Sequence, residues 1–255
     1  MKISIITACY NAQYTIAETI SSVIGQTYSD IEYLIIDGNS SDQTVNIIKS
    51  HPHFGKVSYF VTEPDKGVYD AMNKGISIAS GEIIGLLNAD DVYVDNSVLA
   101  QVAQIFSDTS IDACYADLVY VKEFDSSRIV RYWKSNTYRP GLFEKGWMPA
   151  HPTFFVRKRI YEKYGSFDPL FNLQADFELM MRFLCVHQIK VCYVPRIWVK
   201  MRMGGISNRS LIRSIFSNLD AFRACRKHGL QVSLPSLFIL QKMISRLPQF
   251  FFKRP

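Results

Sequence analysis

Two adjacent carboxylates, Asp90 and Asp91, follow directly on an apolar run at residues 83–87. Like charges at the end of a buried strand disfavour each other's ionisation unless a cation lies nearby. A hard divalent ion with oxygen ligands, shared with a substrate diphosphate, would offset this repulsion, and Mn²⁺ or Mg²⁺ is the ion we expect. In the alternative interpretation, one carboxylate caps a helix that begins near Asp95 or earlier. The motif alone leaves both interpretations open.

Polar residues also follow three other apolar segments. They include Thr7, Tyr10 and Asn11 in the first segment, Asp37 in the second and Lys66 in the third. Asp37 could accept a hydrogen bond from the ring N–H of a ligand, or it could simply be a turn aspartate. Lys66 could neutralise a phosphate, or it could be a solvated loop cation. Ser41 and Asp42 are predicted to be helix caps.

The elements that would position these residues alternate between strand and helix patterns. Strand-like segments are found at 3–9, 31–36, 57–61 and 82–87, with helical segments at 14–25, about 41–50 and 68–79 between them. Strands that are apolar on both faces and separated by helices predict an α/β fold with a parallel sheet covered on both sides. Ligands of such sheets bind outside the carboxyl ends of the strands. The four polar segments should therefore form one polar rim.

The pattern becomes less regular after residue 112, and no internal repeat or low-complexity segment is found. Strand-like segments are expected at 112–121, 128–133, 190–194 and 197–201, and helices near 174–187, 208–227 and 236–247. A segment rich in Pro, Gly and Trp spans 139–153. Pro235 and Pro248 mark the start and the end of the last helix.

The composition is that of an ordinary globular protein. The 255 residues, 48% hydrophobic and 20% charged, suffice for one domain or one domain with a tail, and they argue against disorder. No apolar run approaches the roughly 18 residues needed to span a bilayer. The N-terminus has no signal-peptide pattern, and the five cysteines lack a metal or disulfide spacing. We therefore expect a cytoplasmic protein with reduced cysteines.

Several enzyme classes lose support because their motifs are missing. The chain lacks the Gly-x-Gly-x-x-Gly pattern, the P-loop pattern and the Gly-x-Ser-x-Gly pattern. These absences argue against dinucleotide enzymes, P-loop phosphotransferases and the common serine hydrolases.

Charge is distributed unevenly along the chain. Residues 1–125 contain 6 Lys and Arg against 17 Asp and Glu, whereas residues 126–255 contain 23 against 6. The basic half could face nucleic acid, anionic lipid or a phosphorylated substrate. It contains no nucleic-acid recognition motif, so we expect no nucleic-acid partner.

Four segments together resemble the family 2 glycosyltransferases. They are Ser4-Ile5-Ile6-Thr7 through Tyr10-Asn11, Ile35-Ile36-Asp37-Gly38-x-Ser40-x-Asp42-x-Thr44, Asp65-Lys66-Gly67-x-Tyr69-Asp70-Ala71-x-Asn73-Lys74-Gly75, and Gly81-Glu82-Ile83 followed by Asn88-Ala89-Asp90-Asp91. Their order, spacing and residue types agree over residues 3–92, and the resemblance continues more loosely to 204–207. It implies a GT-A fold, a Rossmann-like mixed sheet with flanking helices, that binds a nucleotide-sugar and inverts the anomeric carbon.

The resemblance also implies roles for the polar rim. Thr7, Tyr10 and Asn11 would lie near the nucleotide, Asp37 would contact the base, and Lys66 would lie near the base or the phosphates. Asp90 would hold the metal. The family usually has Asp-x-Asp where this chain has Asn88-Ala89-Asp90, so Asn88 would bind a ribose hydroxyl and Asp91 would support a single-carboxylate site.

An inverting transfer needs a base that removes the proton of the attacking acceptor hydroxyl. Asp176, at the start of the helix near 174–187, matches the base position of the family's acidic motif, and Glu178 is the second candidate. Ala175 replaces the glutamate that commonly precedes the base. The alternative role of Asp176 is that of an acidic residue favoured by the helix dipole.

Two further segments are candidates for substrate contacts. Trp147 and His151 resemble the acceptor side of these enzymes, although a structural His and a core-filling Trp are the alternatives. Arg202 and Ser207 lie in a turn that could be a flap near the diphosphate or a strand-to-helix connection.

The C-terminal segment combines an apolar helical face with basic flanks. Leu237, Leu240, Ile244, Leu247 and Phe251 recur at helical spacing, with Lys242, Arg246, Lys253 and Arg254 among them and Phe250-Phe251-Phe252 near the end. Such a helix could lie on an anionic membrane surface, or it could pack on the core or on a second copy. A membrane position would suit a lipid-linked acceptor.

Taken together, the sequence predicts a GT-A catalytic domain over 1–205 and a helical, membrane-associating segment over 206–255. Residues 1–110 would bind the nucleotide-sugar, most simply a UDP-sugar, and 111–205 would bind the acceptor. The expected activity is sugar transfer to a lipid-linked saccharide in cell-surface polysaccharide assembly, peripheral to the cytoplasmic face of the inner membrane. The alternatives are transfer to a polyprenyl phosphate and a catalytically silent module that binds sugar-nucleotide or nucleic acid.

Overall fold

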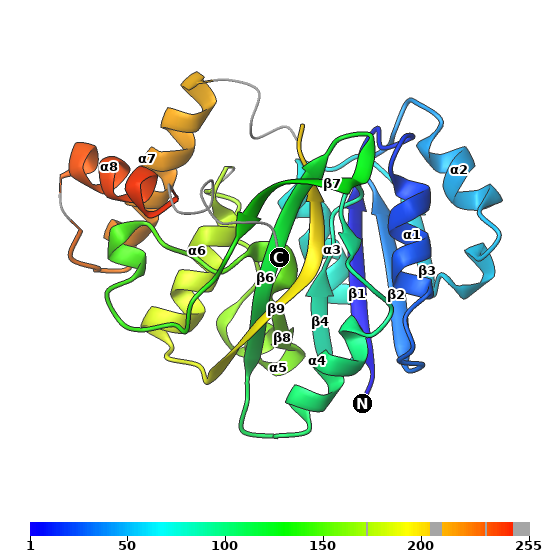
Figure 1. Ribbon diagram of the computed structural model, residues 1–255, viewed down its shortest axis with the longest axis horizontal. Helices are drawn as coiled ribbons and strands as arrows, with labels where there is room; N and C mark the ends of the chain where they lie inside the picture. The colour runs from blue at the N-terminus through cyan, green and yellow to red at the C-terminus, as the bar shows by residue number, and fades with distance from the viewer. Residues whose placement is uncertain (172, 205–210, 233, 247–255) are drawn as a thin grey trace.

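One mixed sheet lies between two layers of helices (Figure 1). The computed structural model describes residues 1–171, 173–204, 211–232 and 234–246. The described strands are β1 (Ile3–Cys9), β2 (Ile31–Asp37), β3 (Tyr59–Thr62), β4 (Ile83–Leu86), β5 (Val92–Tyr93), β6 (Ala113–Lys122), β7 (Asp125–Trp133), β8 (Phe155–Arg157) and β9 (Val191–Arg202). Their order is β3-β2-β1-β4-β8-β6-β9-β5, with β7 paired to β6.

The first half of the sheet is parallel, as the sequence predicts. β1 pairs in parallel with β2 and β4, and β2 pairs in parallel with β3. The register places Cys9 beside Asp37 and Asp37 beside Thr62, so the carboxyl ends of these strands meet at one edge. β8 runs antiparallel to both β4 and β6, which makes the whole sheet mixed.

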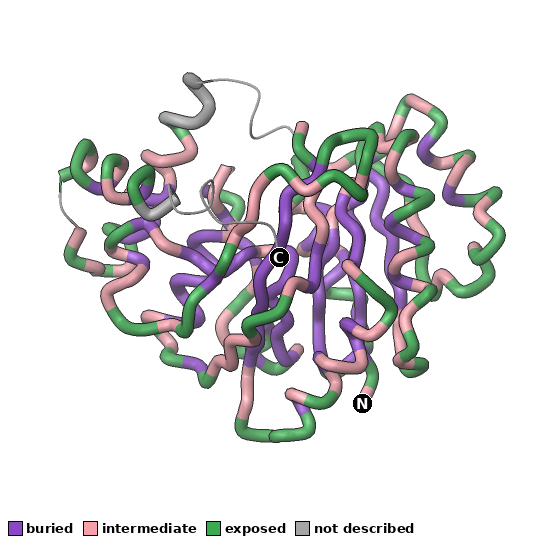
Figure 2. Tube along the Cα trace, viewed as in Figure 1, coloured by how far each residue is buried: buried purple, intermediate pink, exposed green. Residues whose placement is uncertain are grey.

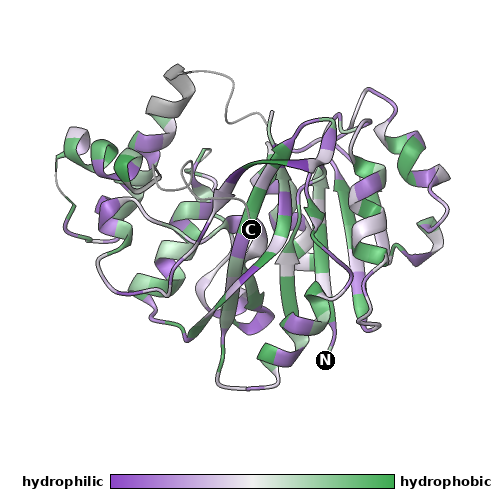
Figure 3. Ribbon diagram, in the orientation of Figure 1, coloured by the Kyte–Doolittle hydropathy of each residue, from purple (hydrophilic) through white to green (hydrophobic). Residues whose placement is uncertain are grey.

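Helices cover both faces of the sheet, and its central strands β1, β4 and β6 are buried on both sides almost throughout. The helices are α1 (Ile16–Ile24), α2 (Thr44–Ser50), α3 (Val68–Ile78), α4 (Val98–Phe106), α5 (Lys158–Tyr164), α6 (Ala175–Met181), α7 (Leu211–Lys227) and α8 (Pro235–Arg246). α1, α2 and α4 pack on one face, where Ile5 and Ile35 are buried, while α3, α5 and α6 pack on the other, against Ile6 and Leu34. The buried strands and their apolar character are visible in Figures 2 and 3.

The second half differs from the predicted elements in three places. The two segments expected at 190–194 and 197–201 form one strand, β9. Its register with β6 shifts between Ala116 and Asp117, because Pro195 and Arg196 of β9 have no paired residue in β6. The helix expected near 174–187 is α6 followed by a π-helical turn over Arg182–Val186. β8 and α5 were not predicted, because three and seven residues are too short to show a clear period.

The C-terminal helices pack beside α6. α7 contacts α6 and α8, and α8 contacts the short 3₁₀ turn Phe143–Lys145. Within the described ranges, no helix is both long and apolar enough to span a bilayer. Ser207, Leu247 and the Phe250-Phe251-Phe252 run, singled out above, lie outside the described residues.

Candidate functional site

The loop after β1 is joined to the loop after β2. The Asn11 amide donates to the Ser40 hydroxyl at 2.8 Å, and the Ser41 amide donates to Asn11 Oδ1 at 2.9 Å. Asn11 has a φ of 50°, a conformation that Asn tolerates better than most residues. Tyr10 is 59% exposed, so its ring is available to a ligand, whereas Thr7 is buried with its hydroxyl 3.1 Å from that of Tyr33. The candidate donor residues thus divide into exposed positions, such as Tyr10, and buried positions, such as Thr7.

Asp37 is wholly buried and its carboxylate is surrounded by donors. Its Oδ1 accepts from the Ser40 hydroxyl at 2.5 Å, and its Oδ2 accepts from the Ser40 amide at 3.0 Å and the Thr62 hydroxyl at 2.6 Å. Cys9 Sγ lies 3.5 Å away. Asp37 therefore holds together the ends of β1, β2 and β3, and its predicted contact with a base would have to replace one of these partners.

Asp65 lies at the same edge and was not singled out by the sequence analysis. It is half-buried, and a Cβ atom added to Gly38 would lie 2.3 Å from its Oδ2 atom, so only glycine allows this approach. Its Oδ1 accepts from the Gly67 amide at 2.8 Å. Lys66, between them, is exposed. The position of Asp65 beside Lys66, in the segment that carries the family resemblance, is the signal that could have identified it.

The acidic pair lies where the chain leaves β4. Asp91 is wholly buried, its Oδ2 accepts from Asn88 Nδ2 at 3.1 Å, and its Oδ1 is buried with no hydrogen-bond partner in the described part of the chain. Asp90 is half-buried. The N-cap interpretation is wrong for both, because α4 begins only at Val98 and the Asp95 carboxylate accepts from the Ser97 amide instead.

The electrostatics of the pair favour a cation. Burial raises the pKa of Asp90, a shift that Arg202 opposes and Glu123 increases. Burial, followed by the charge of Asp90, raises the pKa of Asp91 well above its usual range. The orphaned Asp91 oxygen and the raised pKa values fit a divalent ion held through Asp90, with Asp91 behind it. Among the residues described, no three His, Cys, Asp or Glu side chains form a preassembled metal cluster.

Arg202 links the acidic pair to α1. The side chain is buried, its Nη1 donates to the Asp90 carbonyl at 2.9 Å, and its Nη2 forms an ion pair with Glu18. The sequence analysis placed Arg202 in a turn, either a flap near the diphosphate or a strand-to-helix connection, and gave no partner for it. The turn is wrong for this residue, because Arg202 is the last residue of β9. Glu18 could not be found from the sequence, because it lies 184 residues away in what looks like an ordinary helix.

Asp176 is connected to the donor half of the protein. The Tyr69 hydroxyl of α3 donates to Asp176 Oδ1 at 3.1 Å, and Tyr69 follows Lys66 by three residues. Asp176 is half-buried in the first turn of α6. The structure thus brings the candidate base to the helix that starts at the polar rim.

Glu178, the second candidate base, is buried between two side chains that donate hydrogen bonds to it. Its carboxylate accepts from Arg182 Nε at 2.9 Å and from His228 Nε2 at 2.7 Å. Arg182 also donates to the carbonyl of Ser166 at 2.6 Å. This geometry supports a structural role for Glu178, and it leaves Asp176 as the better candidate.

The two acceptor candidates occupy different surroundings. Trp147 packs in an aromatic cluster with Tyr115, Tyr138 and Phe143, with ring centroids 5.6 to 6.2 Å apart. The Nε2 atom of His151 is buried with no partner among the described residues. Burial lowers the pKa of His151, and the nearby Asp176 carboxylate opposes this shift. His151 is therefore neutral at pH 7, and it lies close enough to Asp176 for the two groups to interact electrostatically.

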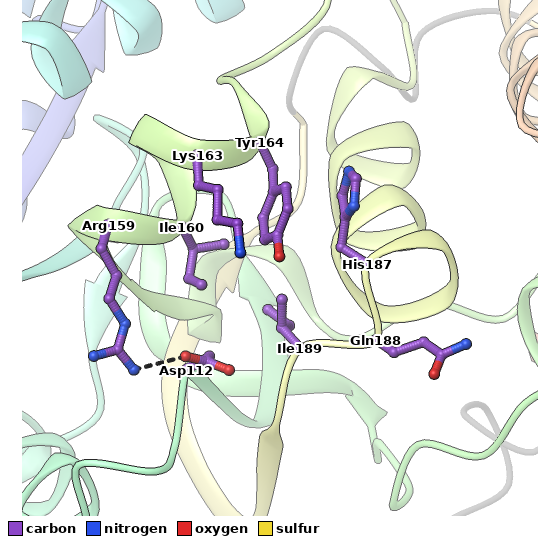
Figure 4. A pocket seen from close by; sticks show the side chains of 8 residues that line it. All are labelled: Asp112, Arg159, Ile160, Lys163, Tyr164, His187, Gln188 and Ile189. Carbon is purple, nitrogen blue, oxygen red and sulfur yellow. Dashed lines mark hydrogen bonds and ion pairs between the residues drawn. The ribbon is translucent and has the colours of Figure 1, made fainter.

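A separate hollow of about 270 Å³ is lined by the eight residues drawn in Figure 4. Asp112 and Ile189, which precede β6 and β9, line it together with Arg159 and His187. These strands run parallel to each other, so the hollow is at their amino ends. It is not part of the polar rim.

Comparison with known proteins agrees with this arrangement. Residues 4–165 match Glycosyl transferase family 2. The chain is 26% identical over 218 residues to the PGL/p-HBAD biosynthesis glycosyltransferase of Mycobacterium bovis, covering 85% of this chain and 83% of that protein.

Two solved structures share the fold. Staphylococcus aureus TarS in complex with UDP has a TM-score of 0.65 at 14% identity, covering 97% of this chain and 72% of that chain. A mannosyltransferase from Pyrobaculum calidifontis, in complex with GDP-Man and Mn²⁺, has a TM-score of 0.67 at 18% identity, covering 95% and 68%. Since the family match extends over more than half of the chain, the protein belongs to glycosyl transferase family 2 and is a glycosyltransferase with a GT-A fold.

Proposed function

We propose that the protein transfers a sugar from a nucleotide-sugar, with a UDP-sugar as the first candidate, to a lipid-linked saccharide with inversion at the anomeric carbon. The observation that carries this proposal is the polar rim with the acidic pair at one end and Asp176 joined to it through Tyr69. The ligands named for the similar structures, UDP and GDP-Man with Mn²⁺, support a nucleotide-sugar donor. The mycobacterial relative is named as a glycosyltransferase of PGL/p-HBAD biosynthesis, which supports sugar transfer in a biosynthetic pathway.

The donor would bind along the carboxyl ends of β1, β2 and β4. Tyr10 is exposed and could stack on the base, while Asp37 fixes the loops around it. Asp65 and Lys66 lie at the same edge and are available to the base or the phosphates. Asn88 is half-buried and could bind a ribose hydroxyl through its carbonyl oxygen, because its Nδ2 is engaged by Asp91.

The reaction would form one bond and break one. The acceptor hydroxyl oxygen attacks the anomeric carbon, its proton passes to the Asp176 carboxylate, and the bond to the diphosphate breaks with its electron pair on the leaving oxygen. Asp90 would hold Mn²⁺ or Mg²⁺. When bound, such an ion supplies charge stabilisation for the departing diphosphate. Arg202 adds a fixed cation next to Asp90.

Binding to a lipid surface would bring the enzyme to a lipid-linked acceptor. Leu237, Leu240, Met243 and Ile244 of α8 are each 45 to 61% exposed, whereas Phe238 and Lys242 on the other side of the helix are buried. Residues 206–255 contain nine Lys and Arg and one acidic residue, Asp220. An exposed apolar face in a basic segment suits an anionic membrane, as expected for a peripheral enzyme at the cytoplasmic face.

Slow donor hydrolysis tests the function without a known acceptor. The purified protein, Asp90→Ala and Asp176→Ala would be incubated with UDP-, GDP- and dTDP-sugars in Mn²⁺, Mg²⁺ or EDTA. Turnover of one donor that needs the metal and is lost in Asp90→Ala is the expected result.

Other results would change the assignment. A labelled single sugar that partitions into organic solvent with polyprenyl phosphate would indicate a polyprenyl-phosphate transferase. Nucleotide binding by calorimetry without any turnover, with or without acceptor, would indicate a silent binding module. An absence of both turnover and binding would contradict the nucleotide-sugar function itself.

A further inference from the structure

One face of α3 connects the two halves of the candidate site. Tyr69 and Asn73 are four residues apart, so they lie on the same side of the helix. Both reach residues that follow β8 in the chain, in the acceptor half. The helix itself begins directly after Lys66 and Gly67, at the polar rim. α3 is thus in contact with both halves.

The contacts of Asn73 fix the loop that precedes α6. Its Nδ2 donates to the Phe167 carbonyl at 2.9 Å, and its Oδ1 accepts from the Phe167 amide at 2.9 Å. This pairing resembles one rung of a β-ladder and holds Phe167 in a single position relative to α3. Tyr69 and His151 both pack against the ring of Phe167. The ring centroids are 5.1 Å apart for Tyr69 and Phe167 and 6.2 Å apart for His151 and Phe167.

The hydroxyl of Tyr69 is held against the carboxylate of Asp176. It donates to Oδ1 at 3.1 Å, and the Phe177 amide donates to the same oxygen at 2.9 Å. Burial, followed by the charge of Asp176, raises the pKa of Tyr69 well above its usual range, so the phenol stays protonated and keeps its role as a donor. In the part of the chain that the structure describes, both hydrogen bonds to this carboxylate go to Oδ1.

We propose that Tyr69 is the positioning residue for Asp176: its hydroxyl holds Oδ1, leaving Oδ2 to take the proton of the acceptor hydroxyl. The inference rests on the proposed function, in which Asp176 is the base. Because Tyr69 is on the helix that begins at the polar rim, it also fixes the base relative to the donor.

Tyr69→Phe removes the hydroxyl and keeps the ring against Phe167. We expect kcat to fall on the order of 10- to 100-fold, as for the loss of one hydrogen bond to a charged group, with the donor KM within about twofold. In protein with ¹³C-labelled aspartate carboxyls, the Asp176 resonance, assigned with Asp176→Asn, should change its chemical shift in Tyr69→Phe at pH 7, because the carboxylate loses the hydrogen bond from Tyr69.

Tyr28→Phe is the matched control. Its hydroxyl donates to the Met1 carbonyl at 2.6 Å, near the amino end of β2 and at the other edge of the sheet. This variant loses a comparable hydrogen bond and should leave kcat, the donor KM and the Asp176 chemical shift unchanged.

The two readouts separate the inference from the function it rests on. Wild-type protein that turns over no donor or acceptor would contradict the proposed function, while the carboxyl chemical shift would still show whether Tyr69 holds Asp176. An unchanged Asp176 chemical shift in Tyr69→Phe overturns the inference. So does a rise in the donor KM with kcat unchanged, because a residue that positions the base acts on the chemical step and not on donor binding.

Discussion

The Nζ atom of Lys242 lies 2.9 Å from Oε1 of Gln174, so α8 contacts the residue immediately before the helix of the candidate base. Lys242 is 1% exposed, and its ammonium lies 5.1 Å from the ring centroid of Phe177. Its stem packs on Gly146, where an added Cβ would lie 2.5 Å from the Lys242 Cβ. The inner face of α8 is therefore part of the support of α6.

Lys242→Ala should destabilise the protein by about 2–4 kcal/mol, since it removes a packed stem as well as a donor. Lys242→Met keeps most of the stem and avoids burying a charge, so its cost should stay below about 1.5 kcal/mol. Urea unfolding of both variants measures the difference. If both variants lost the same free energy of unfolding, the ammonium of Lys242 and not its packed stem would account for the stabilisation.

The buried Glu178 should contribute stability that depends on pH. Burial by itself would raise the pKa of Glu178, but the hydrogen bonds from His228 and Arg182 outweigh it and hold the pKa below its usual range. A lowered carboxyl pKa stabilises the fold fully above the unfolded value, about 4.3, and this contribution is lost as pH falls through the folded pKa. Glu178→Gln should therefore be less stable at pH 7 by about 2 kcal/mol.

Urea unfolding at pH 7 and in steps below pH 4 tests this sign, because the gap to wild type should close as the pH falls. The same variant decides between the two candidate bases. Its kcat per folded molecule should stay within about threefold of wild type, whereas Asp176→Asn should abolish transfer. A pH-independent gap would mean that packing, and not the charge of Glu178, is responsible.

The contribution of Asp90 and Asp91 to stability should depend on pH in the opposite direction to that of Glu178. Because the pKa values of Asp90 and Asp91 are raised, the pair is most favourable when protonated, and stability is lost as pH rises from the unfolded value, about 3.9, through the folded pKa values. At pH 7 a divalent cation should offset the repulsion. Asp90→Asn should raise the Tm of the metal-free protein by a few degrees, about 2–4 °C per kcal/mol at this size, and should abolish stabilisation by Mn²⁺.

Thermal unfolding of both proteins, with Mn²⁺ and with EDTA, provides the measurement at pH 7 and at pH 5. Asp95→Asn is the control, because Asp95 is an exposed turn carboxylate that accepts from the Ser97 amide. Stabilisation by Mn²⁺ that persists in Asp90→Asn would place the cation elsewhere.

The parallel half of the sheet could be predicted from the sequence because each of its strands shows one strong, local pattern. Apolar runs such as Ile83–Leu86, buried on both faces, identify a covered strand, and the polar residues after each run then fall at one edge. The candidate site residues Asp90 and Asp176 came from motifs of the same local kind. Their roles stay predictions.

What the sequence could not provide are partners that depend on long-range packing. Nothing near Asp37 predicts that Thr62, 25 residues away, donates to its carboxylate, and nothing near Arg202 predicts its ion pair with Glu18. Glu178 looked like a possible base because its partner His228 lies 50 residues away. A sequence gives the identity and position of each acidic residue, whereas the fold determines which side chains become its hydrogen-bond and ion-pair partners.

The outer face of α8 should determine membrane binding. Leu240→Glu and Ile244→Glu place carboxylates on the exposed side of the helix, where the native residues are 52 and 54% exposed, so the fold should tolerate them. Their charge should oppose insertion and contact with anionic headgroups. We expect wild type to sediment with vesicles that contain anionic lipid and the double variant to remain largely in the supernatant.

A matched surface variant and neutral vesicles distinguish binding through this face from nonspecific attraction between the basic segment and anionic lipid. Ile78 is 41% exposed on α3, and Ile78→Glu adds the same charge away from α8, so it should sediment like wild type. If Ile78→Glu and the α8 variants lose binding equally, net charge rather than the apolar face controls the attraction. If wild type binds neutral and anionic vesicles equally, the basic segment has no part in it. If it binds neither, membrane binding through α8 is contradicted. Sedimentation velocity then tests the alternative that α8 contacts a second copy of the chain, in which case Leu240→Glu should dissociate a dimer.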